Sequence, residues 1–396
     1  MKYRILLFAF LGFGALACWQ MRQDIHPLTK SWEKVIPHQE PPEGLTSISA
    51  SYCGTCHRDH YDEWKLSTHA LAWHDAQFQA EIKKESSPFM CINCHIPLQN
   101  QQEYIVEGLV NGDIYQPVLK PNPNFDYDLQ QEAITCATCH VRDRAIIGAT
   151  GSTKAPHKVV KDPEFLSEKL CIGCHNASAE LTETLVCTFE TGDEWRVGPY
   201  VEKENCISCH LEEVERAIAP GMTPRLSHRH WFAGSGIPKF DTVVTKMLNG
   251  LVYYPTELPN SFETGDSLGF EFTVKNELAG HRVPTGDPER FFLIRFALKS
   301  ANGVLLAEQT ERIGEKWEWY PRAKKIADNN LYPKEARTYR FNPELDVPGS
   351  LTLTVRVTKH RLDEASAAYN QLGHNYPLFI EIYEEHFPVK VQGAHQ

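Results

Sequence analysis

The sequence repeats one pattern that can hold a metal-containing cofactor, Cys-x-x-Cys-His, at five places. The copies are Cys53, Cys56 and His57; Cys91, Cys94 and His95; Cys136, Cys139 and His140; Cys171, Cys174 and His175; and Cys206, Cys209 and His210. In this pattern the two thiols bond covalently to the vinyl groups of haem, and the adjoining imidazole becomes an axial ligand of the iron. We therefore expect five covalently bound haem c groups whose iron carries electrons.

Structural zinc is the alternative interpretation of this pattern, because paired cysteines and histidines also suit that metal. Zinc does not require a histidine directly after the second cysteine, yet all five pairs have one. The pattern uses ten of the twelve cysteines, which argues against a disulfide framework. The two remaining cysteines are Cys18 and Cys187, and we interpret Cys187 as a buried thiol.

The N-terminus has the layout of a secretory signal peptide over residues 1–17. Lys2 and Arg4 precede an apolar run from Ile5 to Ala17, which is too short to span a bilayer comfortably. Cys18 directly follows the small-residue cleavage site, as in bacterial lipoprotein signals, so two outcomes remain open: a lipid anchor on Cys18 and plain secretion. Both predict an exported chain in the periplasm or at the cell surface, and the first would hold it at a membrane through that lipid.

Length and charge narrow the classes of partner. A chain of 396 residues favours two domains. The formal net charge of −11 argues against a nucleic-acid partner and agrees with redox proteins as electron donors and acceptors. The sequence contains no second apolar stretch long enough to span a membrane.

The chain divides into segments of different character. Residues 18–48 are polar and proline-bearing, and we expect a tether. Residues 49–236 hold all five motifs with few residues per haem, so porphyrins must supply much of the buried apolar surface, with short helices and loops around them. One helix is indicated by His57, Tyr61, Trp64 and Thr68, and we expect Tyr61 and Trp64 to serve in packing.

A β-domain is predicted for residues 258–396, after a linker at 237–257. Residues 270–275 and 351–357 alternate between apolar and polar side chains, which is typical of half-buried strands. Apolar segments at 291–298 and 304–308 flank Asn302-Gly303, a strong hairpin signal. The fold class is therefore α+β: a multihaem domain of short helices and loops, followed by an antiparallel β-sandwich.

An electron carrier usually fills both axial positions of its iron, so five second ligands are needed. The best histidines for this role are His69, His157, His228, His230 and His281. His60 and His74 are weaker choices, and six others are expected in solvent: His26, His38, His360, His374, His386 and His395. Arg282 and Arg290, near His281, could bind a haem propionate or belong to a solvated loop with a local ion pair.

Several segments resemble multihaem cytochromes of the cytochrome c-554 and hydroxylamine oxidoreductase-like group. They are Tyr52-Cys53-Gly54-Thr55-Cys56-His57 with Tyr61, Trp64, Ser67, His69 and Ala70; residues 91–98; residues 135–142; His228-Arg229-His230; and Gly280-His281 with Pro284-Thr285-Gly286. The resemblance implies closely packed bis-histidine haems, with His69 and one of His228 and His230 as distal ligands. The typical c-554 member carries four haems rather than five. The Cys-x-x-Cys-Lys motif of the larger reductases does not occur here.

These observations support an exported electron-transfer cytochrome as the first hypothesis. The second hypothesis is a haem enzyme that acts on a small nitrogen or sulfur compound at a haem with an open sixth position. In a third, the β-domain assembles the protein into a larger redox complex. The motif histidines and distal ligands, together with the ten motif cysteines, are the residues on which the first two hypotheses depend.

Overall fold

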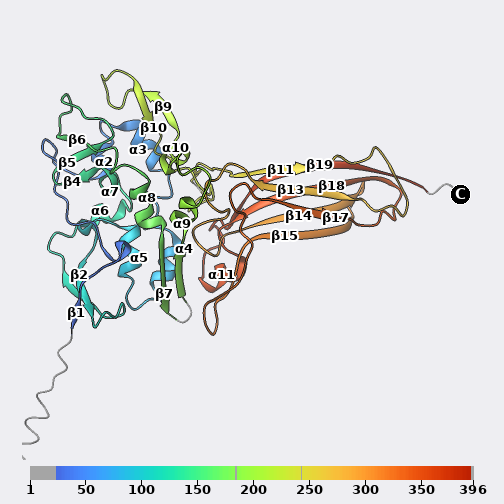
Figure 1. Ribbon diagram of the computed structural model, residues 1–396, viewed down its shortest axis with the longest axis horizontal. Helices are drawn as coiled ribbons and strands as arrows, with labels where there is room; N and C mark the ends of the chain where they lie inside the picture. Colours follow the sequence, from blue (N-terminus) through green and yellow to red (C-terminus); the bar gives the residue numbers. More distant parts are fainter. Residues whose placement is uncertain (1–23, 183–184, 242, 394–396) are drawn as a thin grey trace, which may run out of the picture.

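The computed structural model describes residues 24–182, 185–241 and 243–393. The signal segment, Cys18 and His395 lie outside these residues. Figure 1 shows two parts: a region of short helices and small sheets that carries the five motifs, and an elongated β-domain that extends away from it. No helix in the described ranges is long and apolar enough to cross a membrane. The α+β class predicted from the sequence is confirmed.

The motif region is built from short helices, and most of the motifs lie within one of these helices. Its helices are η1 (Ser31–Glu33), α2 (Ala50–Cys53), α3 (Arg58–Trp64), α4 (Ala76–Ile82), α5 (Phe89–His95), η2 (Gln99–Gln101), α6 (Tyr127–Gln131), α7 (Cys136–His140), α8 (Glu168–His175), α9 (Thr191–Arg196) and α10 (Cys206–His210). The helices α5, α7, α8 and α10 each end at a motif histidine. His57, by contrast, is the N-cap of α3.

Small sheets join these helices. One sheet contains β1 (Ile25–His26), β2 (Tyr104–Val110) and β3 (Pro117–Pro121), and another contains β4 (Val141–Arg142), β5 (Ala145–Gly148) and β6 (Val159–Lys161). Two further sheets have two strands each: β7 (Ala177–Thr182) with β8 (Leu185–Phe189), and β9 (Glu213–Arg216) with β10 (Arg225–His228). The apolar clusters among the described residues of this region are small, such as Phe89, Met90 and Leu109. This agrees with a core completed by porphyrins.

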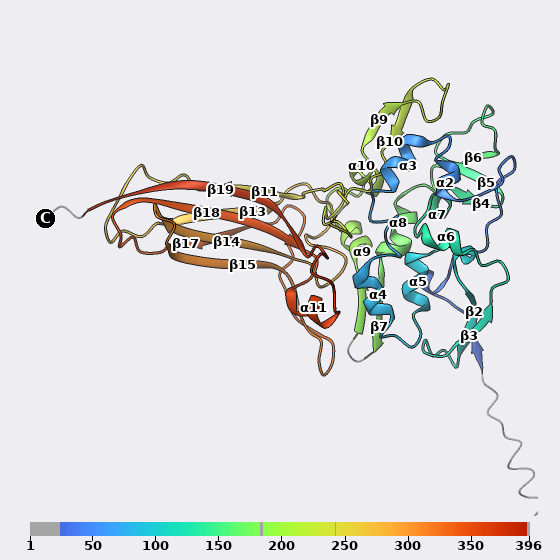
Figure 2. The ribbon, with the colours of Figure 1, turned by 180° about the vertical axis from the view of Figure 1, so that it is seen from behind.

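The β-domain is a sandwich of two sheets. One sheet has the order β11 (Leu251–Pro255), β13 (Phe270–Asn276), β17 (Ala336–Phe341). The other has the order β12 (Phe262–Glu263), β19 (Phe379–Gln392), β18 (Gly349–His360), β14 (Phe291–Ser300), β15 (Leu305–Glu318), β16 (Lys324–Asp328). A short helix, α11 (Glu364–Tyr369), lies near the junction with the motif region (Figure 2).

The alternating side chains of the strands build the core between the sheets. Phe270, Phe272 and Val274 of β13 are fully buried, as the period of two predicts. The Phe272 ring meets the Phe296 ring of β14 edge to face, at 6.0 Å between centroids. The hairpin between β14 and β15 turns at Asn302-Gly303, where Gly303 has a φ of 78°, which suits glycine.

Three boundaries differ from those expected. Residues 24–48 are not a free tether, because Ile25 pairs with Val110 of β2 and Ile36 bridges to Leu98. The β-domain begins before residue 258, because β11 starts at Leu251 within the expected linker. The helix through Tyr61 ends at Trp64, and turns follow it. Trp64 is buried beside Tyr61, as expected for packing.

Candidate haem centres

Most motif histidines are held in one orientation by a backbone carbonyl. Their Nδ1 atoms donate hydrogen bonds as follows: His57 to Ile218 O (2.8 Å), His95 to Ala72 O (2.8 Å), His140 to Ile147 O (2.9 Å) and His210 to Ala233 O (2.6 Å). A proton on Nδ1 leaves the lone pair on Nε2. This second hydrogen bond is the usual way in which proteins orient a metal-binding imidazole. These four side chains are therefore prepared to bind iron through Nε2.

Cysteine sulfur atoms of different motifs lie close to one another. Hydrogen-bond contacts join three pairs: Cys53 with Cys136, Cys94 with Cys174, and Cys171 with Cys206. These contacts bring the first motif to the third, and the fourth motif to the second and the fifth.

Four motif histidines face a second imidazole at nearly one spacing. The ring centroids are separated by 6.4 Å for His57 and His157, 6.2 Å for His140 and His230, 6.2 Å for His175 and His69, and 6.3 Å for His210 and His281. Two metal–imidazole bonds of about 2 Å, plus about 1 Å from each nitrogen to its ring centre, give roughly 6 Å. The four pairs thus have the spacing that an iron ligated by both rings requires.

Burial keeps these imidazoles uncharged, which is the form that binds a metal. Burial lowers the pKa of His69 and of His230 to about 3, and that of His175 and of His281 to about 4. A protonated imidazole would lose the lone pair that bonds to iron. At neutral pH all four rings therefore have a lone pair available.

Other predicted histidines do not face a motif histidine in this way. The ring of His60 lies 6.1 Å from that of His57, but both belong to one helical turn and Nε2 of His60 contacts Ser227 Oγ at 3.1 Å. Nε2 of His74 donates to Gln131 O at 2.9 Å. His228 also donates from Nδ1 to a backbone carbonyl, Leu211 O at 2.9 Å, but no ring contact of His228 with a motif histidine is found in the described ranges. Of the His228 and His230 pair, the geometry therefore favours His230.

The second motif lacks a partner imidazole within the described residues. The aromatic ring nearest to His95 is Phe78 of α4, whose plane is within 6° of the imidazole at 3.5 Å between centroids. Phenylalanine has no lone pair for iron, so it orients His95 without replacing a ligand. His228 cannot serve here, because Figures 1 and 2 place β10 at the top of the motif region and α5 in its lower half.

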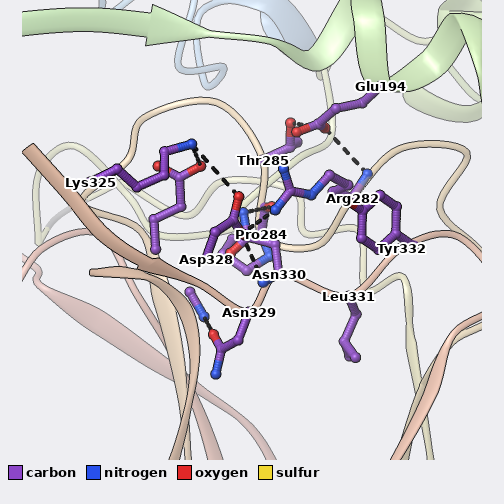
Figure 3. A network of polar contacts seen from close by, with 12 residues as sticks. Glu194, Arg282, Pro284, Thr285, Lys325, Asp328, Asn329, Asn330, Leu331 and Tyr332 are labelled. Carbon is purple, nitrogen blue, oxygen red and sulfur yellow. Dashed lines mark hydrogen bonds and ion pairs between the residues drawn. The ribbon is translucent and has the colours of Figure 1, made fainter. Parts of the chain in front are cut away.

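The loop that carries His281 is fixed between the two domains (Figure 3). Glu194 of α9 accepts hydrogen bonds from the Arg282 N–H at 3.2 Å and the Thr285 hydroxyl at 2.6 Å. Asn330 of the β-domain donates to Pro284 O at 3.0 Å. A Cβ on Gly280 would lie 2.1 Å from a ring carbon of Trp195, so only glycine lets the loop approach α9 this closely. These contacts hold His281 over the fifth motif.

The neighbours of His230 form a buried ionic cluster. Glu63 of α3, whose side chain is 8% exposed, accepts two hydrogen bonds from Arg216 at 2.7 and 2.9 Å. It also accepts from Arg229 at 2.9 Å and from the His230 backbone N–H at 2.8 Å. These partners lower the pKa of Glu63 against the effect of burial. Glu63 therefore positions His230, as Glu194 positions the His281 loop.

Sequence reasoning did not identify Glu63 or Glu194, because their partners lie far away along the chain. The two arginines near His281 are both paired with protein groups. Arg282 forms an ion pair with Asp328, and Arg290 donates to Thr285 O at 3.0 Å. This ion pair is not the local one expected of a solvated loop, because Asp328 lies 46 residues further along the chain and the Arg282 side chain is only 11% exposed. Cys187 is partly buried, and burial raises its thiol pKa to about 12.

Comparison with known proteins bears on the class of protein and on its fold. Residues 52–111 match the family model described as cytochrome c554 and c-prime. The comparison with curated proteins finds no match. A solved structure, a penta-heme cytochrome c552 from Thermochromatium tepidum, superposes with a TM-score of 0.62 at 16% identity, over 86% of this chain and 98% of the other.

A second solved structure, the CARDB domain of a Pyrococcus furiosus protein, matches with a TM-score of 0.20 at 21% identity, over 36% of this chain and 87% of that one. This TM-score is too low to indicate anything about function. The likeness to the penta-heme protein shows a common fold that spans both domains. The family match and the repeated motif support a multihaem c-type cytochrome with covalently bound haem.

Proposed function

We propose that the chain binds five haems and conducts electrons between redox proteins. The observation that carries this proposal is the uniform spacing of 6.2–6.4 Å in four pairs of imidazoles. The haems are numbered 1 to 5 in the order of the motifs. The distal ligands are then His157 for haem 1, His230 for haem 3, His69 for haem 4 and His281 for haem 5.

Two histidines on one iron leave no coordination position for a substrate, which suits electron transfer rather than catalysis. When bound, haem supplies an iron that alternates between ferric and ferrous states. The protein residues hold the rings, bury them and keep them neutral. The redox partners exchange electrons with the chain at haems near the surface.

The contacts between thiols support one order of haems. Cys53 with Cys136 connects haem 1 to haem 3, and Cys171 with Cys206 connects haem 4 to haem 5. An electrostatic interaction between Cys139 and Cys174 indicates that haems 3 and 4 are neighbours, which gives the series 1–3–4–5. Cys94 with Cys174 attaches haem 2 to haem 4 as a side branch. Haem 4 is thus the point through which electrons from every branch pass.

The haem count and the iron ligands can be tested on the purified full chain. Its intact mass should exceed the mass of the polypeptide by five haems, and its oxidised electron paramagnetic resonance spectrum should show low-spin iron at haems 1, 3, 4 and 5. A colourless zinc-loaded product would reject the proposal. Two or more high-spin haems would reject the bis-histidine pairs.

Export and anchoring form a separate part of the proposal. We infer that the chain is exported, because haem attachment of this type accompanies export and residues 1–17 have the layout of a signal. Lipidation at Cys18 would tether it to a membrane. A Cys18→Ser variant should then move from the membrane to the soluble fraction. Equal solubility of parent and variant would reject the lipid and leave export untouched.

A second candidate function is supported by His95, which lacks a partner imidazole in the described ranges. If haem 2 had an open sixth position, a small nitrogen or sulfur compound could bind its iron. The protein would then be an enzyme in which the other haems supply or remove electrons. A high-spin component in the oxidised protein would favour this alternative.

A further inference from the structure

The proposed series of haems 1–3–4–5 has two ends, and both ends are attached at the protein surface. Cys56 of the first motif and Cys209 of the fifth are exposed, whereas the other eight motif cysteines are partly buried. Electrons pass between proteins only across short gaps, so a redox partner must dock where a haem lies close to the surface. Haem 1 and haem 5 are therefore the two candidate docking points.

The charges around the haem 1 end are balanced. Arg58 pairs with Asp62 at 2.9 Å, and Lys65 pairs with the same carboxylate at 2.6 Å. Asp59 is a second exposed carboxylate in this segment, so two cations face two anions. This end offers no net charge by which to attract a partner of either sign.

The haem 5 end carries a surplus of carboxylates. Residues 202–213, which surround the fifth motif in sequence, contain one exposed cation, Lys203. The same stretch contains four exposed carboxylates: Glu202, Glu204, Glu212 and Glu213. Glu212 makes one long contact with Arg229, at 3.8 Å, and the other three have no ion-pair partner in the part of the chain that the structure describes. Unpaired carboxylates at a docking point favour a positively charged partner.

Two apolar side chains are exposed next to these carboxylates. Val197, the C-cap of α9, is 84% exposed, and Val201, in the turn before α10, is 46% exposed. Neither valine adds much to the core of this protein, but each could lose water against a partner. Apolar side chains surrounded by charged ones are the usual composition of a protein–protein interface.

The loop that presents these residues is held in place by the β-domain (Figure 1). A Cβ on Gly198 would lie 2.2 Å from a backbone oxygen of the β-domain, which shows how closely the two backbones approach. The Tyr200 hydroxyl donates to Glu277 O at 2.9 Å. The β-domain cations Lys275 and Lys334 both pair with the Glu277 carboxylate, at 2.5 and 2.9 Å. The docking surface is therefore preformed, and the neighbouring cations are already paired.

We propose that a small basic redox protein docks on the haem 5 surface, which we define as Val197, Val201, Glu202, Glu204, Glu212 and Glu213 around Cys209. This inference rests on the proposed function, because it requires haem 5 at the end of the series. Lysines of the partner would meet the carboxylates and steer the encounter, while the valines would form the apolar contact. One electron then passes from ferrous haem 5 to the oxidised metal centre of the partner, and no bond forms or breaks.

The test uses the reduced full chain and oxidised mitochondrial-type cytochrome c, a basic protein, as the probe in stopped-flow experiments. The second-order rate constant should fall as salt is added, because opposite charges attract less when they are screened. A double variant, Glu202→Gln with Glu204→Gln, should lower the rate constant about threefold or more at low salt and approach the parent at high salt. The matched control, Glu308→Gln with Glu344→Gln, removes the same charge from exposed β-domain sites and should keep the parent rate.

A Val201→Ser variant tests the apolar part of the contact and should slow the reaction at every salt concentration. Equal slowing by both double variants would show that only the total charge matters and would overturn the inference. A parent rate that does not respond to salt would also overturn it. If Asp59→Asn with Asp62→Asn slowed the reaction instead, the partner would dock at haem 1, contrary to the inference.

Haem content and full reduction by dithionite are measured before these reactions. Fewer than five haems would reject the proposed function itself. Five reducible haems without the expected dependence on salt and on the haem 5 carboxylates would reject only the docking surface.

Discussion

The imidazole of His281 lies 6.3 Å from that of His210, and the two ring planes are within 17° of parallel. His210 ends a helix of the motif region, whereas His281 belongs to the β-domain. If His281 ligates haem 5 as proposed, the β-domain contributes a ligand to that haem. Because Glu194 and Trp195 hold the His281 loop, the coordination of haem 5 would then depend on the relative position of the two domains.

Replacing His281 should alter one haem only. A His281→Ala variant should convert haem 5 from low to high spin and shift its reduction potential upward, because one strong ligand is lost. Electron paramagnetic resonance and a redox titration of the purified protein measure both changes. The matched control is His386→Ala, since His386 is an exposed side chain on β19 of the same domain. If the spectrum of His281→Ala contained no more high-spin haem than that of the parent, His281 would not be a ligand.

Glu63 provides a test of how His230 is positioned. Glu63→Ala would leave the buried Arg216 without its carboxylate partner, although it still donates to His228 O, and breaking a buried pair costs about 3–5 kcal/mol. We expect a lower free energy of unfolding in urea and a partly high-spin haem 3, because His230 also loses the acceptor of its backbone N–H. Asp62→Asn is the control, since Asp62 pairs at the surface with Arg58 and Lys65. A fully low-spin Glu63→Ala variant would show that His230 is held by other contacts.

The sequence was sufficient to predict the features that depend on residues close together along the chain. Cys-x-x-Cys-His attaches a haem within one helical turn, and the alternation at Phe270, Phe272 and Val274 directly shows which face of β13 is buried. The distal ligands depend on segments that meet only in the folded chain. Nothing local distinguishes His230 from His228: the choice follows from where His140 and Glu63 lie.

Contacts between distant segments also explain why the observed domain boundaries differ from the predicted ones. Residues 24–48 are polar enough to be interpreted as a tether. Gln39 is nevertheless buried, and its backbone N–H donates to Oδ1 of Asn100 at 2.8 Å. That His95 has no partner imidazole among the described residues was also not predicted, because thirteen histidines outside the motifs were more than enough for five positions. Only the placement of α4 and α5 shows that His95 faces Phe78.

The stability of the β-domain should depend on the aromatic core between its two sheets. Phe272 is fully buried and packs against Phe296 and Tyr383. Phe272→Ala should lower the free energy of unfolding by about 3–5 kcal/mol, through lost burial and the cavity left behind. Urea unfolding followed by tryptophan fluorescence measures this loss. Val304→Ala, at an exposed site in the β14–β15 turn, should change little; equal effects would contradict the assigned core.

The junction between the domains should weaken as pH rises from about 4.5 to about 7. Burial, with a contribution from Asp287, raises the pKa of Glu289 from 4.5 to about 7, and Gln77 of α4 donates to its carboxyl group at 3.2 Å. A raised acid pKa means that the folded state prefers the protonated form. Its contribution to stability is therefore complete below about pH 4.5 and is lost as pH rises through about 7. Glu289→Gln should remove this part of the pH dependence, as measured by urea unfolding at several pH values, whereas Glu344→Gln, at an exposed site, should retain it. A Glu289→Gln profile parallel to that of the parent would show that other groups control the junction.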